Sequence, residues 1–285
     1  MPRGSRFLPI VFITSLALSA AARTEAASLV FCSPGSPGDT AQAGPTMAQL
    51  ARAIEKAASL ESGVVSAEYH ESEAAGIEAI RAAGTLLAAV PVPFFLEHER
   101  DLGLVPRLGI ASSSGQPERY ALVARKGTVA GPADLDGWEV TGSIGYAESF
   151  VRRAFAKEFG TIPDGARVTF NAAPLQALRR ASAGDRIAVL LDAAQSVSLA
   201  SLPFGADLSV LARTEPLPSG LVCVAKGRPT DKATASILKG LERLPKSAEG
   251  KDVLASIRVQ RFEPIDAAGI VRLRTASGQA GAHAP

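Results

Sequence analysis

The chain has 285 residues, of which 47% are apolar and 20% charged, so it can form a sizeable core and global disorder is excluded. It holds 30 basic and 28 acidic residues, and residues 1–27 contribute three arginines and one glutamate. The remainder is formally neutral, which argues against a nucleic-acid binder, because such a protein carries a basic excess. Two cysteines are too few for a disulfide scaffold or a cysteine-rich metal site.

The N-terminus has the order of residues that is typical of a secretory signal peptide. Arg3 and Arg6 precede an apolar run over residues 7–22, and small residues follow. The run is about 16 residues long, below the roughly 20 that span a bilayer, which disfavours the alternative of a membrane anchor. We expect residues 1–27 to be a signal peptide that is cleaved near Ala22–Ala27, and the mature protein to be periplasmic.

Strands alternate with helices in the first part of the mature chain. The expected elements are strand 28–33, helix 46–60, strand 64–69, helix 72–83, strand 85–90, helix 94–102 and strand 107–111. In the first helix Met47, Leu50 and Ile54 recur at helical spacing, and Thr46 with Gln49 fits a capping box. This alternation predicts a mostly parallel sheet covered by helices.

A polar stretch at residues 112–117 interrupts this rhythm before a second alternating series begins. Its expected elements are strand 138–143, helix 147–159, strand 167–170, helix 174–183, strand 186–191, helix 193–202 and strand 208–212. Pro174 fits a first helical position, and Asp192 with Gln195 fits a capping box. Residues 232–244 and 248–257 read as further helices, and residues 275–285 as a disordered tail.

Two similar strands bracket the second series, at residues 119–126 (RYALVARK) and 219–226 (SGLVCVAK). We expect them to lie side by side as the hinge between two lobes. Residues 28–118 and 227–274 would form lobe 1, and residues 127–218 would form lobe 2. Each lobe is expected to be α/β with a mixed, mostly parallel sheet.

Two segments of this layout are similar to a known family. ERYALVARKG followed by ADLDGW, and AEGKDVLASIRVQRFEPI near the C-terminus, resemble segments of type II periplasmic binding proteins, in particular the phosphate/phosphonate (PhnD-like) substrate-binding proteins of ABC importers. The resemblance covers residues 28–271. It implies the two-lobed fold, a cleft for a small and possibly anionic molecule, and a permease partner. Phosphonate-binding members show consecutive hydroxyls where residues 142–149 read GSIGYAES here.

Candidate ligand-binding residues follow from the rule that loops at the carboxyl ends of strands border a crevice. These candidates are Ser33, Ser36, Thr40, Phe94, Ser143, Gly145, Tyr146, Ser149, Asp192 and Glu215. Turn formation and helix capping are the competing roles for the polar residues, and core packing is the competing role for Phe94. Helix N-termini beside such loops suit anions, but the candidates include no cationic clamp, so a neutral polar ligand fits as well as an oxyanion.

Catalytic signatures are missing from the sequence. It holds three histidines, and it contains no HExxH, GxSxG, GxxxxGK[ST] or GxGxxG pattern. We therefore expect a monomeric solute-binding protein for an ABC importer, with no cofactor and no catalytic residue. The alternatives are a sensory or adaptor protein that uses the same cleft, and an enzyme on the same fold.

The two cysteines, Cys32 and Cys223, lie in apolar strands. An oxidising compartment allows a disulfide. The resemblance implies that their strands share a sheet without being neighbours, and strands two apart lie roughly 9.5 Å from each other, beyond the ~7 Å Cα limit for a disulfide. We therefore expect two buried thiols.

Overall fold

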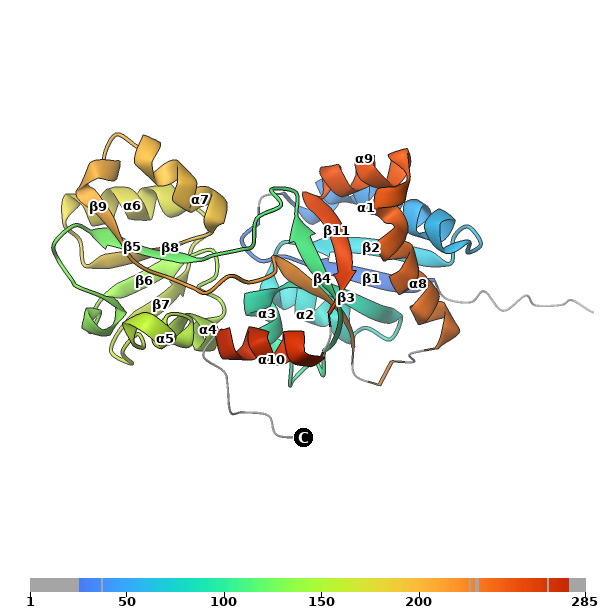
Figure 1. The fold of residues 1–285 in the computed structure, drawn as a ribbon, viewed down its shortest axis with the longest axis horizontal. Helices are drawn as coiled ribbons and strands as arrows, with labels where there is room; N and C mark the ends of the chain where they lie inside the picture. Colours follow the sequence, from blue (N-terminus) through green and yellow to red (C-terminus); the bar gives the residue numbers. More distant parts are fainter. Residues whose placement is uncertain (1–25, 37, 226, 229–230, 266, 277–285) are drawn as a thin grey trace, which may run out of the picture.

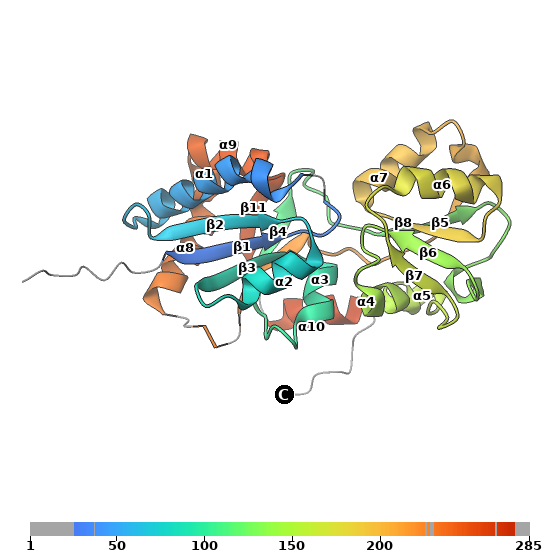
Figure 2. The same ribbon diagram turned by 180° about the vertical axis from the view of Figure 1, so that it is seen from behind.

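The computed structural model describes residues 26–36, 38–225, 227–228, 231–265 and 267–276. Most of the predicted signal peptide and the predicted tail beyond residue 276 lie outside the described residues. The described chain forms two α/β lobes that lie side by side and are joined by two crossing segments (Figure 1). The view from behind shows the same division (Figure 2).

Lobe 1 is built on a six-stranded sheet in the described chain, in the order β11-β4-β10-β3-β1-β2. Its strands are β1 (Ala27–Cys32), β2 (Val65–His70), β3 (Thr85–Pro91), β4 (Val105–Ser112), β10 (Gly220–Val224) and β11 (Val259–Pro264). Strand β1 is parallel to β2 and β3, whereas β10 is antiparallel to β3 and β4, and β11 is antiparallel to β4. The sheet is therefore mixed, as predicted, but two of its strand pairs are parallel and three are antiparallel, so it is not mostly parallel by pairing.

Helices cover both faces of this sheet. They are α1 (Thr40–Ala58), α2 (Glu73–Arg81), α3 (Val92–His98), α8 (Lys232–Arg243), α9 (Ala248–Ser256) and α10 (Ala267–Ala276). One apolar cluster joins α1, α8 and α9 to the sheet, and a second cluster joins α2 and α3 to its other side. Helix α10 lies beside α3, where Arg274 contacts Glu99 at 2.8 Å (Figure 1).

Lobe 2 contains a five-stranded sheet among the described residues, in the order β7-β6-β8-β5-β9. Its elements are β5 (Ala121–Arg125), β6 (Glu139–Gly142), α4 (Glu148–Arg153), α5 (Ala156–Phe159), β7 (Arg167–Phe170), α6 (Pro174–Ala183), β8 (Ile187–Leu191), α7 (Ala193–Ser198) and β9 (Leu208–Arg213). Strand β6 is parallel to β7 and β8, whereas β5 is antiparallel to β8 and β9. Short 3-10 helices complete the described elements, at Pro132–Asp134, Leu199–Ser201, Gly205–Asp207 and Leu244–Lys246.

The two similar strands belong to different sheets, so the prediction that residues 119–126 and 219–226 lie side by side is wrong. Strand β5 is in the sheet of lobe 2, and β10 is in the sheet of lobe 1. The chain crosses just before each strand, where Glu118 and Leu217 form an antiparallel bridge with N···O distances of 2.8 and 2.9 Å. These crossing segments form the connection between the lobes.

Helix α1 begins six residues earlier than predicted. Asp39 caps it by accepting a hydrogen bond from the backbone N–H of Gln42 at 2.8 Å, so the predicted Thr46–Gln49 capping box is wrong. Pro45 lies inside the helix, although proline is favoured at a first helical position. The polar cap before the proline determines where this helix starts.

One continuous apolar cluster runs from lobe 1 into lobe 2. It includes Phe94 and Phe95 of α3 as well as Phe150 and Phe155 of lobe 2, each at most 2% exposed. The rings of Tyr120 and Phe150 meet edge to face at 5.9 Å. The lobes are therefore packed together on the side of α3 and α4. Over the described residues, no helix has the length and hydropathy needed to cross a bilayer.

Candidate functional site

A cleft of about 590 Å³ lies between the lobes. Lobe 1 contributes the loop after β1, the start of α1 and the ends of β2, β3 and β4, and lobe 2 contributes the loops after β6 and β8. Five of the candidate residues line it, namely Ser33, Ser36, Ser143, Tyr146 and Asp192. Asp192 also caps α7 in the predicted capping box with Gln195. These residues stand at the carboxyl ends of β1, β6 and β8, as the crevice rule requires.

Two other candidates of lobe 1, Thr40 and Phe94, do not line the cleft. Thr40 donates from its backbone N–H and from Oγ1 to Oε2 of Glu71, at 3.0 and 2.5 Å. Phe94 is fully buried, and its ring lies 4.7 Å from that of His98. Core packing, the competing role for Phe94, is the one that the structure shows.

The remaining candidates belong to lobe 2 and also lie away from the cleft lining. A Cβ on Gly145 would lie 2.0 Å from the carbonyl oxygen of Thr169, so this glycine is needed where the loop after β6 crosses β7, not for approach to a ligand. Ser149 is exposed in the first turn of α4. Glu215 pairs with Lys157 at 3.1 Å in a separate hollow beside α10.

The tyrosines as a group were not predicted from the sequence. The chain has three tyrosines, and all of them, Tyr69, Tyr120 and Tyr146, line the cleft. The hydroxyl oxygens of Tyr69 and Tyr146 are both buried. That of Tyr69 finds no hydrogen-bond partner within the described structure, whereas that of Tyr146 lies against the backbone of Phe94. The tyrosines therefore form part of the wall of the cleft.

Glu118 is a second residue that the sequence analysis missed. It lies in the first crossing segment and lines the cleft. Its Oε1 accepts hydrogen bonds from the backbone N–H groups of Ala193 at 2.7 Å and Arg119 at 3.2 Å, whereas no described residue donates to Oε2. Burial, and to a lesser degree the charge of Asp192, raise the pKa of Glu118 above its ordinary value.

The lobes touch at what we call the mouth of the cleft, formed by Gly35, Ser143 and Phe170. Gly35 has a φ of 78°, and a Cβ on it would lie 2.9 Å from the Cβ and the carbonyl oxygen of Ser143, and 3.2 Å from the ring of Phe170. Only glycine fits both this backbone conformation and this approach. The lobes therefore touch each other at this edge of the cleft.

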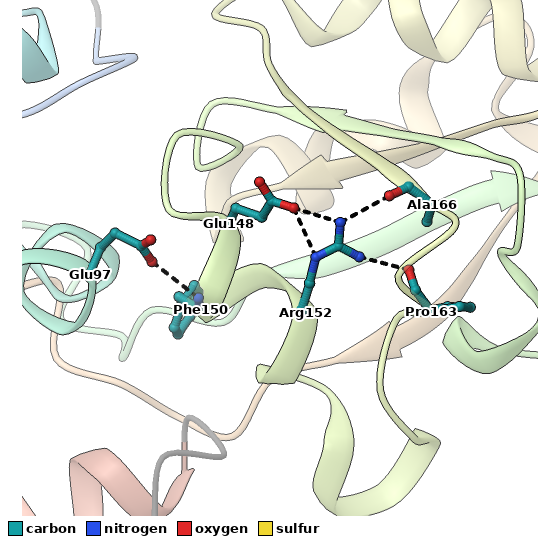
Figure 3. A network of polar contacts seen from close by, with 6 residues as sticks. All are labelled: Glu97, Glu148, Phe150, Arg152, Pro163 and Ala166. Atoms are coloured by element: carbon teal, nitrogen blue, oxygen red, sulfur yellow. Dashed lines mark hydrogen bonds and ion pairs between the residues drawn. The ribbon is translucent and has the colours of Figure 1, made fainter. Parts of the chain in front are cut away.

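A second contact between the lobes is what we call the base, formed by α3 and α4 with Phe94, Glu97 and Phe150. The ring of Tyr146 lies between the base and the mouth, 6.5 Å from that of Phe94 and 6.4 Å from that of Phe170. Oε2 of Glu97 on α3 accepts a hydrogen bond from the backbone N–H of Phe150 on α4 at 3.4 Å (Figure 3). Arg152 fastens α4 to its own lobe, because its guanidinium donates to Glu148 and to the carbonyl oxygens of Pro163 and Ala166 at 2.5–3.0 Å (Figure 3).

Both cysteines are free and fully buried, which confirms the expectation of two thiols. They lie on β1 and β10, which both pair with β3 and are therefore two strands apart. Burial, followed by the charge of Glu73, raises the pKa of Cys32 to about 12. Burial also raises the pKa of Cys223. No group of three potential metal ligands occurs in the part of the chain that the structure describes.

No protein-family model and no curated protein matches the sequence. Among solved structures, a Xanthomonas citri protein bound to chloride is similar, with a TM-score of 0.67 and 14% identity over 90% of this chain and 98% of that chain. The binding protein of an ABC phosphonate transporter from Pseudomonas aeruginosa has a TM-score of 0.60 and 14% identity, over 87% of this chain and 85% of that chain. PhnD1 from Prochlorococcus marinus, in complex with methylphosphonate, has a TM-score of 0.53 and 12% identity over 89% of this chain and 99% of that chain. The chain thus has the two-lobed fold of the type II periplasmic binding proteins.

Proposed function

We propose that the chain is an exported substrate-binding protein that captures a small solute between its lobes and presents it to an ABC permease. The observation that carries the proposal is the cleft of about 590 Å³, which is lined by every tyrosine of the chain and lies between lobes that touch at its edge. A cavity of this size accommodates a small molecule. The structures of similar fold from Pseudomonas aeruginosa and Prochlorococcus marinus, which are named for phosphonate transport and methylphosphonate binding, support this role.

Binding by closure explains the two kinds of interlobe contact. A solute that touches both lobes favours the closed form, because the open form lacks half of its contacts. The base keeps the lobes attached while the crossing segments around Glu118 and Leu217 bend. One chain supplies both walls of the cleft, so we infer a monomer, which light scattering during size-exclusion chromatography would check.

Export rests on the N-terminal signal peptide. Strand β1 begins at Ala27, whose backbone N–H donates to the carbonyl oxygen of Val64 at 2.8 Å. Cleavage after Ala22 or Ala26 leaves this strand complete, so we place the cut there. Mass spectrometry of the protein isolated from the periplasm would give the new N-terminus, and recovery of the uncleaved chain in the cytoplasm would contradict export.

Two alternatives use the same cleft. A sensory protein would close in the same way but bind a receptor, so uptake into vesicles that carry the permease separates it from an importer component. An enzyme would need an activated group in the cleft. The pKa of Cys32, the cysteine that lines the cleft, is raised to about 12, which leaves that thiol protonated and unreactive at neutral pH.

The test of the binding function is ligand-induced stabilisation together with closure. Metabolite pools from the host cell are screened by thermal shift, and each stabilising fraction is examined by small-angle X-ray scattering. We expect at least one fraction to raise the melting temperature and to reduce the radius of gyration, since a bound ligand stabilises the state that it prefers. The absence of any stabilising fraction would remove the support for a binding protein.

A further inference from the structure

The helix N-termini beside the cleft are already occupied by carboxylates of the protein. At α1, Asp39 accepts from the N–H of Gln42 at 2.8 Å, and Glu71 accepts from the N–H of Thr40 at 3.0 Å. Free N–H groups at a helix start are what makes it an anion site. An incoming anion at α1 would meet two negative charges instead of these free donors.

The same arrangement recurs in lobe 2. Asp192 accepts from the N–H of Gln195 at 2.7 Å, and Glu118 accepts from the N–H of Ala193 at 2.7 Å, so two carboxylates serve the start of α7. At α4, which begins just after the cleft-lining loop, Glu97 reaches across from lobe 1 to the N–H of Phe150. At each of these helix starts, a carboxylate of the protein therefore already accepts a hydrogen bond from a backbone N–H group.

The charge of the described cleft lining is negative on balance. It includes the carboxylates of Asp39, Glu118 and Asp192, none of which pairs with a described cation, and one arginine, Arg258. Arg119 and Arg213, which lie near the hinge in the sequence, are exposed and do not line the cleft. The lining lacks the cluster of arginines or lysines that would offset these carboxylates for an anionic ligand.

Two further features favour a positive group. Oε2 of Glu118 accepts no hydrogen bond from the described residues, while Oε1 is already used twice. Tyr120, two residues after Glu118, lines the same cleft and is 5% exposed. Its hydroxyl has no hydrogen-bond partner among the described residues. Tyrosine rings attract cations through their faces, and a desolvated site strengthens this attraction.

We propose that the solute is a small organic amine, bound through its protonated ammonium group to Oε2 of Glu118 beside Tyr120, and that the cleft rejects phosphonates and sulfonates. This inference rests on the proposed binding function and names its substrate class. The ammonium group donates hydrogen bonds to the carboxylate, and Asp192 adds a second negative charge nearby. The similar fold thus serves a ligand of opposite charge to methylphosphonate.

The test compares small amines with small anions. Ethanolamine, putrescine and cadaverine on one side, and methylphosphonate, ethylphosphonate and ethanesulfonate on the other, are each titrated into the protein. Calorimetry and thermal shift at low and at physiological salt, and small-angle X-ray scattering, follow the titrations. We expect at least one amine to raise the melting temperature and to reduce the radius of gyration, and none of the anions to do so. Failure of all the amines overturns the inference, as does stabilisation by a phosphonate or sulfonate.

Variants then assign the effect to Glu118. E118Q keeps an oxygen for the N–H of Ala193 but removes the charge, so we expect amine affinity to fall about tenfold or more, because a hydrogen bond to a charged group is lost. Burial already raises the pKa of this carboxyl, so the ligand-free variant should be at least as stable as the parent protein. Unchanged amine affinity in E118Q overturns the assignment.

A matched pair of caps controls for loss of helix stability. Asp192 caps α7 at the cleft, and Asp231 caps α8 away from it. Each accepts a hydrogen bond from the backbone N–H of the residue three positions later in the chain. D192N should weaken amine binding, whereas D231N should lower stability and leave amine affinity unchanged. Equal effects of the two variants on amine affinity would contradict an electrostatic role for the cleft carboxylates.

The two proposals fail in different ways. If host metabolites contain a stabilising solute that is anionic or neutral, the protein is still a binding protein and only the charge inference falls. If neither the host metabolites nor the amines stabilise the protein, the binding function falls as well.

Discussion

The base and the mouth join the same two lobes with opposite chemistry. At the base, fully buried aromatic rings of α3 and α4 pack in one apolar cluster that spans both lobes. At the mouth, a glycine of lobe 1 lies against a serine of lobe 2 beside a half-exposed phenylalanine. Apolar packing holds elements together without a ligand, whereas the mouth contributes little burial of its own. We therefore expect the lobes to part more readily at the mouth than at the base.

The largest expected effect on stability comes from removing a buried aromatic ring at the base. Phe150→Ala removes a ring that is 0% exposed and contacts Tyr120, so we expect the free energy of unfolding to fall by about 3–5 kcal/mol. Phe170→Ala at the mouth is the matched control, because Phe170 is 50% exposed and should cost less than about 1 kcal/mol. Urea unfolding measures both variants. Similar losses would mean that the base and the mouth are equally packed.

A smaller effect is expected from obstructing the mouth. Gly35→Ala places a Cβ 2.9 Å from Ser143, so closure is strained, and any solute that stabilises the parent protein should bind about tenfold more weakly. Gly38→Ala is the control, since Gly38 also has a positive φ, of 115°, but a Cβ there meets nothing within 4 Å. Calorimetry gives the affinities. Equal weakening by both variants would assign the effect to loop strain instead of closure.

The smallest effect concerns Cys32, which belongs to the apolar cluster of the base and also lines the cleft. Its pKa is raised to about 12 in the folded protein, from an ordinary value of 9.0, so the folded state holds its proton more tightly. Stability should therefore fall as the pH rises past about 9, by about 0.8 kcal/mol at pH 9.5 for this thiol. Urea unfolding at pH 7.5 and 9.5 should show a weaker pH dependence in Cys32→Ala. An identical pH dependence would mean that water reaches the thiol through the cleft.

Local signals predicted the elements well where caps and prolines are unambiguous. Helix α6 has the predicted bounds, because Pro174 starts it and Gly184 ends it with a positive φ of 111°. The start of α1 was missed because Thr46 with Gln49 fits a capping box, whereas the cap that the structure shows is Asp39. Such errors arise where two possible caps lie about two turns apart.

Local sequence patterns do not predict which distant strands pair with each other. Residues 121–125 and 220–224 are both short apolar strands, yet they join different sheets, and only the packing of whole lobes separates them. The site shows the same limit. The crevice rule placed Ser33, Ser143 and Asp192 correctly at the cleft, but Glu118 follows no predicted strand, and its role depends on the start of α7, about 75 residues further along the chain.

The distribution of the aromatic residues gives the molecule two separate optical reporters. Every tyrosine lines the cleft, whereas the one tryptophan of the chain, Trp138, is 6% exposed at the start of β6, outside the cleft lining and under the guanidinium of Arg186. Tyrosine emission should therefore respond to occupancy of the space between the lobes, and tryptophan emission to the unfolding of lobe 2. Capture of a solute and loss of structure can thus be followed in one unlabelled sample at two wavelengths.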